Sequence, residues 1–97
     1  MRLVFHSRVA IDVARIMRYY EEVAGAQLAN EFYAEIQRHF VAVAKTPEAH
    51  RKYSGELRRA DLTRFPYHFL YRTAGDHVRV LVVRHHRRHP NVGLSRW

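Results

Sequence analysis

The clearest structural signal in this sequence is Phe65-Pro66-Tyr67-His68-Phe69-Leu70-Tyr71-Arg72, which is followed by Ala74-Gly75-Asp76 and His77–His86. Its apolar and aromatic residues repeat with a period near two, as they do in β-strands. Ala74-Gly75-Asp76 has the composition of a hairpin turn. Residues 77–86 carry apolar residues in near-continuous order, which is typical of an interior strand. The stretch therefore predicts a β-hairpin inside a sheet, to which residues 57–62 and 2–6 add further strands.

Between residues 9 and 43 the apolar period is that of amphipathic helices. The first stripe is Val9, Val13, Ile16, Tyr20 and Val23, and the second is Leu28, Phe32, Ile36, Phe40 and Val43. Ser7 is the expected N-cap of the first helix, Gly25 separates the two helices, and Pro47 follows the second. Residues 47–56 lack a period and predict a polar loop. The sequence thus predicts an α+β fold of order β-α-α-β-β-β, in which an N-terminal helical hairpin packs on a small, largely antiparallel sheet.

The chain of 97 residues has the length of a single domain, spanning residues 1–97. It contains no cysteine, which excludes disulfides, thiolate metal sites and thiol catalysis. No apolar run reaches the roughly 18–20 residues of a membrane span, and the first residues do not have the pattern of a signal peptide. We therefore expect a cytoplasmic protein without membrane contacts.

The positive charge is concentrated in the second half of the chain. The net charge is +8, and residues 49–97 alone hold eleven Lys and Arg against three Asp and Glu. Aromatic residues lie among these arginines, and guanidinium groups bind phosphates and carboxylates. The pattern predicts a polyanionic or acidic partner. A solvated surface of an arginine-rich protein is the alternative reading.

Few residues have the pattern of a catalytic or metal site. His85-His86-Arg87-Arg88-His89 has no Asp, Glu or Cys close by in sequence to complete a metal site, and its arginines repel cations, so we expect no metal or cofactor. His85 or His89 could serve in acid–base chemistry. The helical glutamates, Glu35 among them, are expected on solvated faces. Neither a glycine-rich phosphate loop nor a nucleophilic serine motif is present.

Several of these motifs occur together in one known family. They run from Ala10-x-Asp12-Val13 and Tyr19-Tyr20 through Phe32-Tyr33-x-Glu35-Ile36 to Leu57-Arg58-Arg59, Arg64-Phe65-Pro66-Tyr67, Tyr71-Arg72 and His85-x-x-Arg88-x-Pro90. In this order and spacing, the chain resembles ParE toxins of the ParE/RelE superfamily of bacterial toxin–antitoxin systems. It departs from them at Gly93, where ParE-like tails often carry a tryptophan, and its own tryptophan is Trp97.

The resemblance implies a toxin that inhibits DNA gyrase and is neutralised by an acidic, ParD-like antitoxin. We therefore favour a binding function over catalysis, and endoribonuclease activity is the expectation if the chain is an enzyme. The target-binding residues we expect are Arg58, Arg59, Arg64, Tyr67, Arg72, Arg87, Arg88 and Arg96. The antitoxin-binding residues we expect are Tyr19, Tyr20, Phe65 and Tyr71. The alternative is a RelE-like, ribosome-dependent endoribonuclease of messenger RNA with His85 and Arg88 as catalytic residues, although the C-terminal tyrosine and Lys-x-Lys pattern of those enzymes are absent.

Overall fold

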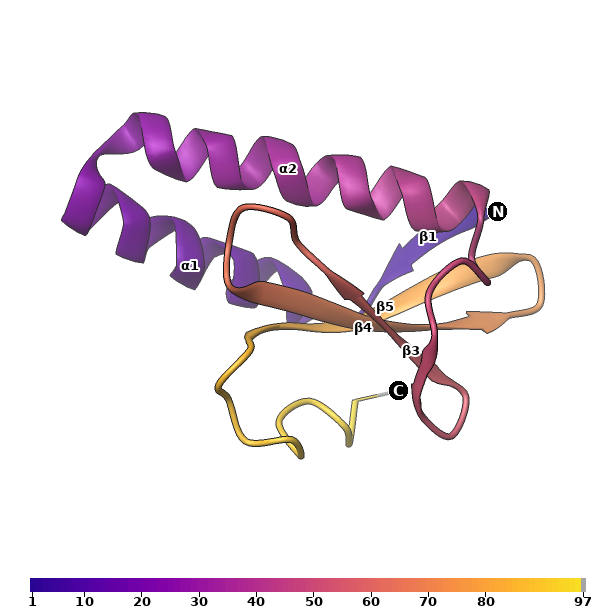
Figure 1. Cartoon of the computed structure of the whole chain (residues 1–97). Helices are drawn as coiled ribbons and strands as arrows, with labels where there is room; N and C mark the ends of the chain where they lie inside the picture. The colour runs from indigo at the N-terminus through magenta and orange to yellow at the C-terminus, as the bar shows by residue number, and fades with distance from the viewer. Residues whose placement is uncertain (97) are drawn as a thin grey trace.

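The computed structural model describes residues 1–96, in which two helices cover one face of a five-stranded sheet (Figure 1). The helices are α1 (Val9–Ala24) and α2 (Ala26–Lys45). The strands are β1 (Arg2–Phe5), β2 (Lys52–Ser54), β3 (Leu57–Asp61), β4 (Tyr67–Ala74) and β5 (His77–His85). Their spatial order is β1-β5-β4-β3-β2, with β1 parallel to β5 and the other neighbours antiparallel.

This architecture confirms the predicted α+β fold and corrects it at one strand. Residues 52–54, expected within a loop, form the edge strand β2 and pair with the start of β3. The turn between them places Gly55 at a φ of +56°, a conformation that glycine adopts without steric cost. Strand β5 lies between β1 and β4, as its apolar sequence predicted.

The two helices bury most of the predicted stripes. All five positions of the second stripe are buried or partly buried, whereas the first stripe ends at Tyr20 because Val23 is 59% exposed. The prediction of Ser7 as N-cap is wrong. Arg8 occupies the N-cap position without a side-chain cap, and its amide donates to Nδ1 of His6 (3.1 Å). The imidazole of His6 thus accepts a hydrogen bond from the backbone just before the helix begins.

Glu35 on α2 is not on a solvated face, contrary to expectation. Its side chain lies among buried residues, and the residue is only 3% exposed. One carboxylate oxygen accepts hydrogen bonds from the amides of Thr63 (2.6 Å) and Arg64 (3.1 Å) in the loop between β3 and β4. Glu35 therefore fastens this loop to the helical layer.

The main core lies between the helices and the sheet and is rich in aromatic rings. Tyr20 of α1 has its ring within 5.3–6.2 Å, centre to centre, of the rings of Phe32, Phe65 and Tyr67. The pairs with Phe65 and Tyr67 are edge-to-face, an arrangement that adds to the stabilisation that apolar burial provides. The fully buried Tyr71 also belongs to this layer, and its hydroxyl donates to the carbonyl of Pro47 (2.7 Å).

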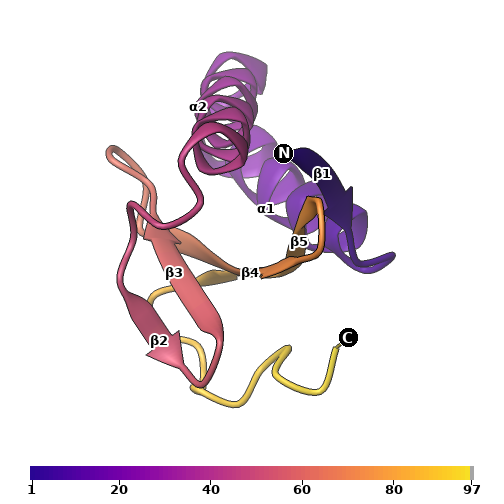
Figure 2. The same ribbon diagram turned by 90° about the vertical axis from the view of Figure 1, so that its right-hand side faces the viewer.

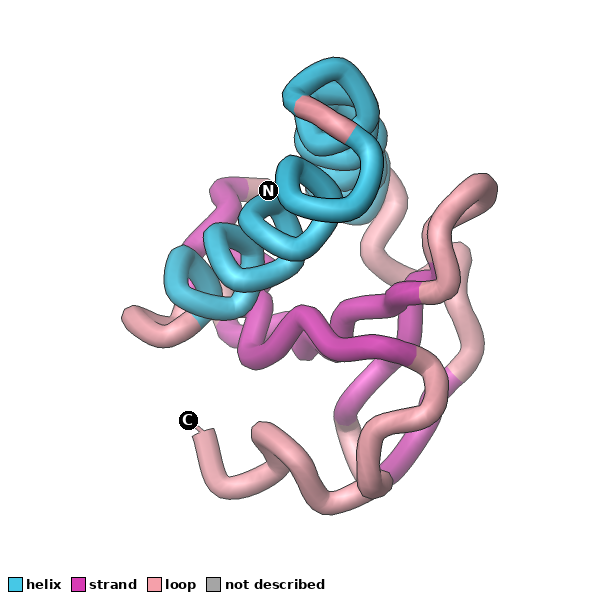
Figure 3. The backbone as a smooth tube through the Cα atoms, turned by 90° about the vertical axis from the view of Figure 1, so that its left-hand side faces the viewer, coloured by secondary structure: helices cyan, strands magenta, loops and turns pink. Residues whose placement is uncertain are grey.

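The C-terminal segment 86–96, here called the tail, covers the other face of the sheet (Figures 2 and 3). Beneath it lies a small apolar cluster formed by Leu57, Leu70, Leu81 and Val82, against which Leu94 of the tail packs. Gly93 has a φ of +84°, and a Cβ there would lie 2.6 Å from the Cβ of Val82. The tail is therefore packed closely on the sheet at this glycine.

Candidate functional site

One buried arginine of β5 fixes the path of the tail. Arg84 is 4% exposed, and its Nη1 donates to the carbonyls of Pro90 (2.7 Å) and Val92 (3.0 Å). Its Nη2 donates to the hydroxyl of Tyr53 (2.9 Å), and its Nε donates to Nε2 of His68 (2.9 Å). A single guanidinium group therefore links β5, β4, β2 and the tail.

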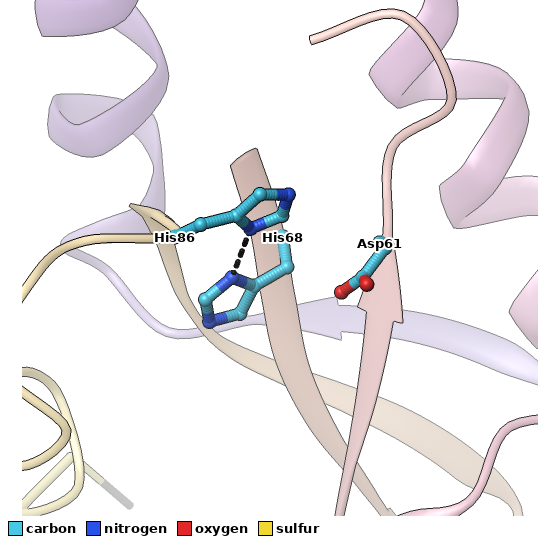
Figure 4. A group of neighbouring side chains, drawn as sticks. All are labelled: Asp61, His68 and His86. Carbon is cyan, nitrogen blue, oxygen red and sulfur yellow. Dashed lines mark hydrogen bonds between the residues drawn. The ribbon is translucent and has the colours of Figure 1, made fainter. Parts of the chain in front are cut away.

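His68 of β4 and His86 at the start of the tail form a stacked pair next to Asp61 (Figure 4). The two Nδ1 atoms are 2.9 Å apart, and the ring planes differ by 13°. Because Nε of Arg84 can only donate, Nε2 of His68 must accept, and the proton of the neutral His68 ring is on Nδ1. His68 therefore donates to Nδ1 of His86, which leaves the proton of neutral His86 on Nε2.

The surroundings keep this pair uncharged. Burial, together with the nearby charges of Arg59 and Arg84, lowers the pKa of His68 to about 3. Burial also lowers the pKa of His86. For Asp61, burial acts in the opposite direction, but the hydrogen bond and charge of Arg59 hold the pKa of its carboxyl below the ordinary value. The result is a neutral histidine pair between two arginines.

Asp61, His68 and His86 have ligand atoms within 4.8 Å of one another, a spacing that could hold a metal ion. Their other contacts argue against that use. Arg59 donates to Asp61 (2.6 Å) and lies 3.3 Å from Nδ1 of His86, while Arg84 holds His68 in the tautomer whose Nδ1 is protonated. To bind here, a cation would have to displace the guanidinium of Arg59 from Asp61 and His86. It would also have to remove the proton from Nδ1 of His68 while Arg84 still donates to Nε2 of the same ring. The cluster is better suited to attaching the tail to β4.

A second attachment joins the end of the tail to α1. Arg96 donates through Nη1 (2.6 Å) and Nη2 (3.2 Å) to the two carboxylate oxygens of Asp12, whose Oδ2 also accepts from the amide of Val83 (3.1 Å). The side chains of Arg96 and Asp12 are only 13% and 8% exposed. Arg96, expected to bind the target, is thus engaged in a largely buried ion pair.

The other predicted target-binding residues are spread over several surfaces. Arg87 and Arg88 are exposed on the tail. Arg58 donates to the carbonyl of His50 (2.6 Å), and Arg64 pairs with Glu31 (3.0 Å) on the helical side. Of the other predicted target-binding residues, Arg59 lies in the histidine cluster and Tyr67 lies in the main core. Arg72 lies on β4, directly opposite Arg79 of β5.

The predicted antitoxin-binding residues fall mostly in the core. Tyr19 is 54% exposed, and Tyr20 is half-buried. Phe65 and Tyr71 are buried in the helix–sheet layer and present no surface on which another protein could dock while the fold is intact. Phe65 and Tyr71 were expected to bind the antitoxin, but the period-two alternation of residues 65–71 indicates one face of a strand, and that face is covered by the helices.

An apolar groove lies along the helical hairpin, and none of its lining residues is among the predicted binding residues. It is bordered by the end of β1, by α1 and by α2, and its volume is about 470 Å³. Phe5 and Tyr33, on its border, are among the large apolar residues that remain exposed. An apolar groove with exposed aromatic side chains at its border is typical of protein–protein contacts. The apolar lining residues are Phe5, Val9, Ala10, Val13, Ala14, Met17, Tyr33 and Phe40.

His85 and Arg88, the residues suggested for a ribonuclease, line one cavity between α1 and the tail. The ring of His85 lies 5.0 Å from that of Tyr67, and its Nδ1 accepts a hydrogen bond from the amide of Arg87 (3.0 Å). The structure thus brings His85 and Arg88 to one cavity, and the ring of His85 lies 6.3 Å from that of His86.

The chain is similar to proteins of one known family. The family model for the ParE toxin of the type II toxin–antitoxin system parDE matches residues 3–90. This chain belongs to the ParE toxin family. The fold is similar to that of a solved chain described as the chromosomal ParDE toxin–antitoxin system from P. aeruginosa, with a TM-score of 0.78. That match covers 88% of this chain and 95% of the other at 18% identity. A search of curated proteins gave no match.

Membership in this family makes the chain a toxin of a type II toxin–antitoxin system, as the resemblance implied. Such a system includes an antitoxin partner. Within residues 1–96, neither helix has the length and apolar character needed to cross a membrane.

Proposed function

We propose that this ParE-family toxin acts in the bacterial cytoplasm by binding DNA gyrase and blocking replication, and that an acidic, ParD-like antitoxin neutralises it. The observation that carries the proposal is the family match over residues 3–90, combined with a tail that presents Arg87 and Arg88 on a rigidly fastened loop. A preorganised basic loop favours binding, because less conformational entropy is lost when the target is engaged.

The groove on the helical hairpin supports the antitoxin part of the proposal. It lies on the helical face, whereas the tail lies on the opposite face of the sheet (Figure 2). An amphipathic segment of the antitoxin could bury its apolar side there, and the net charge of +8 favours acidic residues flanking that segment. A protein bound in the groove would leave the tail's arginines uncovered unless it extends around the molecule.

The experiment is a supercoiling and DNA-cleavage assay with purified gyrase and plasmid. The toxin should block supercoiling or trap cleaved DNA, and the double variant Arg87→Gln/Arg88→Gln should lose at least tenfold in potency, since two charged contacts are removed. Arg38→Gln, which removes an exposed arginine from α2, is the matched control. Full supercoiling at a tenfold excess of toxin over gyrase would refute the proposal.

A messenger-RNA endoribonuclease is the second candidate, because His85 and Arg88 line a common cavity. Pulse-labelling of DNA and protein synthesis after induction separates the two functions. Gyrase inhibition stops DNA synthesis first, whereas messenger cleavage stops translation first. If translation stops first and His85→Ala prevents it while antitoxin binding is intact, the ribonuclease replaces the gyrase proposal.

A further inference from the structure

The cavity between α1, the end of β5 and the tail has the composition of an oxyanion site. Its volume is about 170 Å³, below the roughly 300–1,000 Å³ of pockets for drug-sized ligands, so it suits one functional group rather than a whole molecule. Its arginines are Arg15 of α1, Arg84 of β5, and Arg88 and Arg96 of the tail, and His85 of β5 lines it as well. Arg84 already donates to His68, Tyr53 and carbonyls of the tail. Ile16, Val82, Val83 and Val92 form its apolar lining.

The one carboxylate in the cavity is already satisfied. Asp12 accepts two hydrogen bonds from Arg96 and one from the amide of Val83. Its charge is thus compensated within the protein, and Arg96 and Asp12 together contribute no net charge.

Apart from Asp12 and the hydroxyls of Tyr19 and Tyr67, the polar side chains of the cavity are donors. Among residues 1–96, neither Arg15 nor Arg88 has a carboxylate within ion-pair distance. Nδ1 of His85 accepts the amide of Arg87, so the ring proton of His85 is on Nε2, which can donate. Two guanidinium groups without a carboxylate partner among residues 1–96 and one imidazole N–H, set beside an apolar lining, form a site for an anion, since the one carboxylate there is already bound by Arg96.

The number of donors points to a tetrahedral dianion. A carboxylate carries one charge and two oxygens, and Asp12 shows that one arginine already satisfies it in this cavity. A phosphate monoester carries a charge of about −1.5 to −2 and three terminal oxygens, which match two arginines and three donor groups. Tyr19, at the border of the cavity and 54% exposed, offers a ring on which a nucleobase can stack.

We propose that this cavity binds the terminal phosphate of a nucleotide or of a nucleic-acid strand. Arg15, His85 and Arg88 bind its oxygens, and Tyr19 contacts the attached nucleoside. The inference does not depend on gyrase being the target.

The test is an NMR titration of the free chain, in which the amide signals of Val83 and His85 are followed. The probes are a thymidine dinucleotide with a 5′-phosphate, the same dinucleotide with a 5′-hydroxyl, inorganic phosphate and a phosphoserine peptide. The phosphorylated dinucleotide should shift these signals at a concentration at least tenfold lower than the hydroxyl form. Equal responses to both dinucleotides would overturn the proposal. Equal or tighter binding of inorganic phosphate, or of the peptide, would overturn the assignment to nucleic acid.

Substitutions locate the binding. Arg15→Gln and Arg88→Gln should each weaken binding of the phosphorylated dinucleotide at least tenfold, because each removes a charge-assisted contact. Arg87→Gln is the matched control, since Arg87 is the exposed neighbour of Arg88 but does not line the cavity. Equal weakening by Arg87→Gln and Arg88→Gln would show non-specific attraction to a basic surface and refute the site. Well-dispersed spectra confirm that each variant is folded.

Discussion

Replacing His68 by glutamine should remove a large part of the chain's sensitivity to mild acid. In the native structure the neutral His68 ring accepts a hydrogen bond from Arg84 at Nε2 and donates one to His86 from Nδ1. A second proton, on Nε2, would break the hydrogen bond with Arg84 and place a positive charge next to its guanidinium. A glutamine amide offers both an acceptor and a donor but does not titrate.

The size of the effect follows from proton linkage. The pKa of His68 falls from 6.5 to about 3 on folding, so the unfolded chain binds a proton that the folded chain excludes. Stability that is present above pH 6.5 is therefore lost as the pH falls. Between pH 7 and pH 5 the loss from His68 alone is about 2 kcal/mol at 1.36 kcal/mol per pKa unit, and this value holds for any folded pKa well below 5.

Urea unfolding at pH 7, 6 and 5, followed by circular dichroism, measures this loss. With an m-value of about 1–3 kcal/mol/M, the wild-type midpoint should fall by roughly 0.7–2 M from this contribution, and His68→Gln should not show it. His89→Gln removes an exposed histidine and serves as the control. If His68→Gln loses stability with falling pH as steeply as the wild type, the tautomer and proton exclusion assigned to His68 are wrong.

Three further substitutions test the attachments that position the tail and loops. Asp12→Asn should lower the free energy of unfolding, measured by thermal unfolding, by about 3 kcal/mol, because it leaves the largely buried Arg96 unpaired. The double variant Asp12→Leu/Arg96→Met should lose less than Asp12→Asn alone. Gly93→Ala should destabilise the chain by about 1–3 kcal/mol more than Gly55→Ala. Both glycines have positive φ, but only a Cβ at Gly93 would meet a neighbouring side chain. Equal destabilisation by the two variants would argue against close packing of the tail. Glu35→Gln should cost about 1–2 kcal/mol and speed amide hydrogen exchange in the loop after β3, and unchanged exchange there would contradict its role.

The sequence predicted the elements better than it predicted the contacts between them. Periodicity identified both helices and the long strands, because burial on one face imposes that period. It missed β2, whose three residues are too few for a period to show.

The contacts of His68 show why the site could not be read from the sequence. At the turn between β4 and β5, Ala74 pairs with His77. A register that continued from this pair without a break would place His68 opposite Val83. The register shifts by one residue near Leu81, and His68 lies opposite Arg84 instead. A bulge of this kind changes which side chains meet across two strands. The Asp12–Arg96 pair, 84 residues apart, likewise exists only through the tertiary fold.

The two surfaces for which we propose antitoxin binding and target binding lie on opposite faces of one sheet. The apolar groove belongs to the helical face, whereas the fastened basic tail belongs to the other. Arg84 and Arg96 hold the tail by inward contacts with the backbone and Asp12, so they set its path without presenting charge to a partner. Exposed residues such as Arg87 and Arg88 can therefore change without disturbing that path. Under this proposal, a toxin built in this way can alter its target through a few surface side chains while keeping its fold and the groove proposed for the antitoxin.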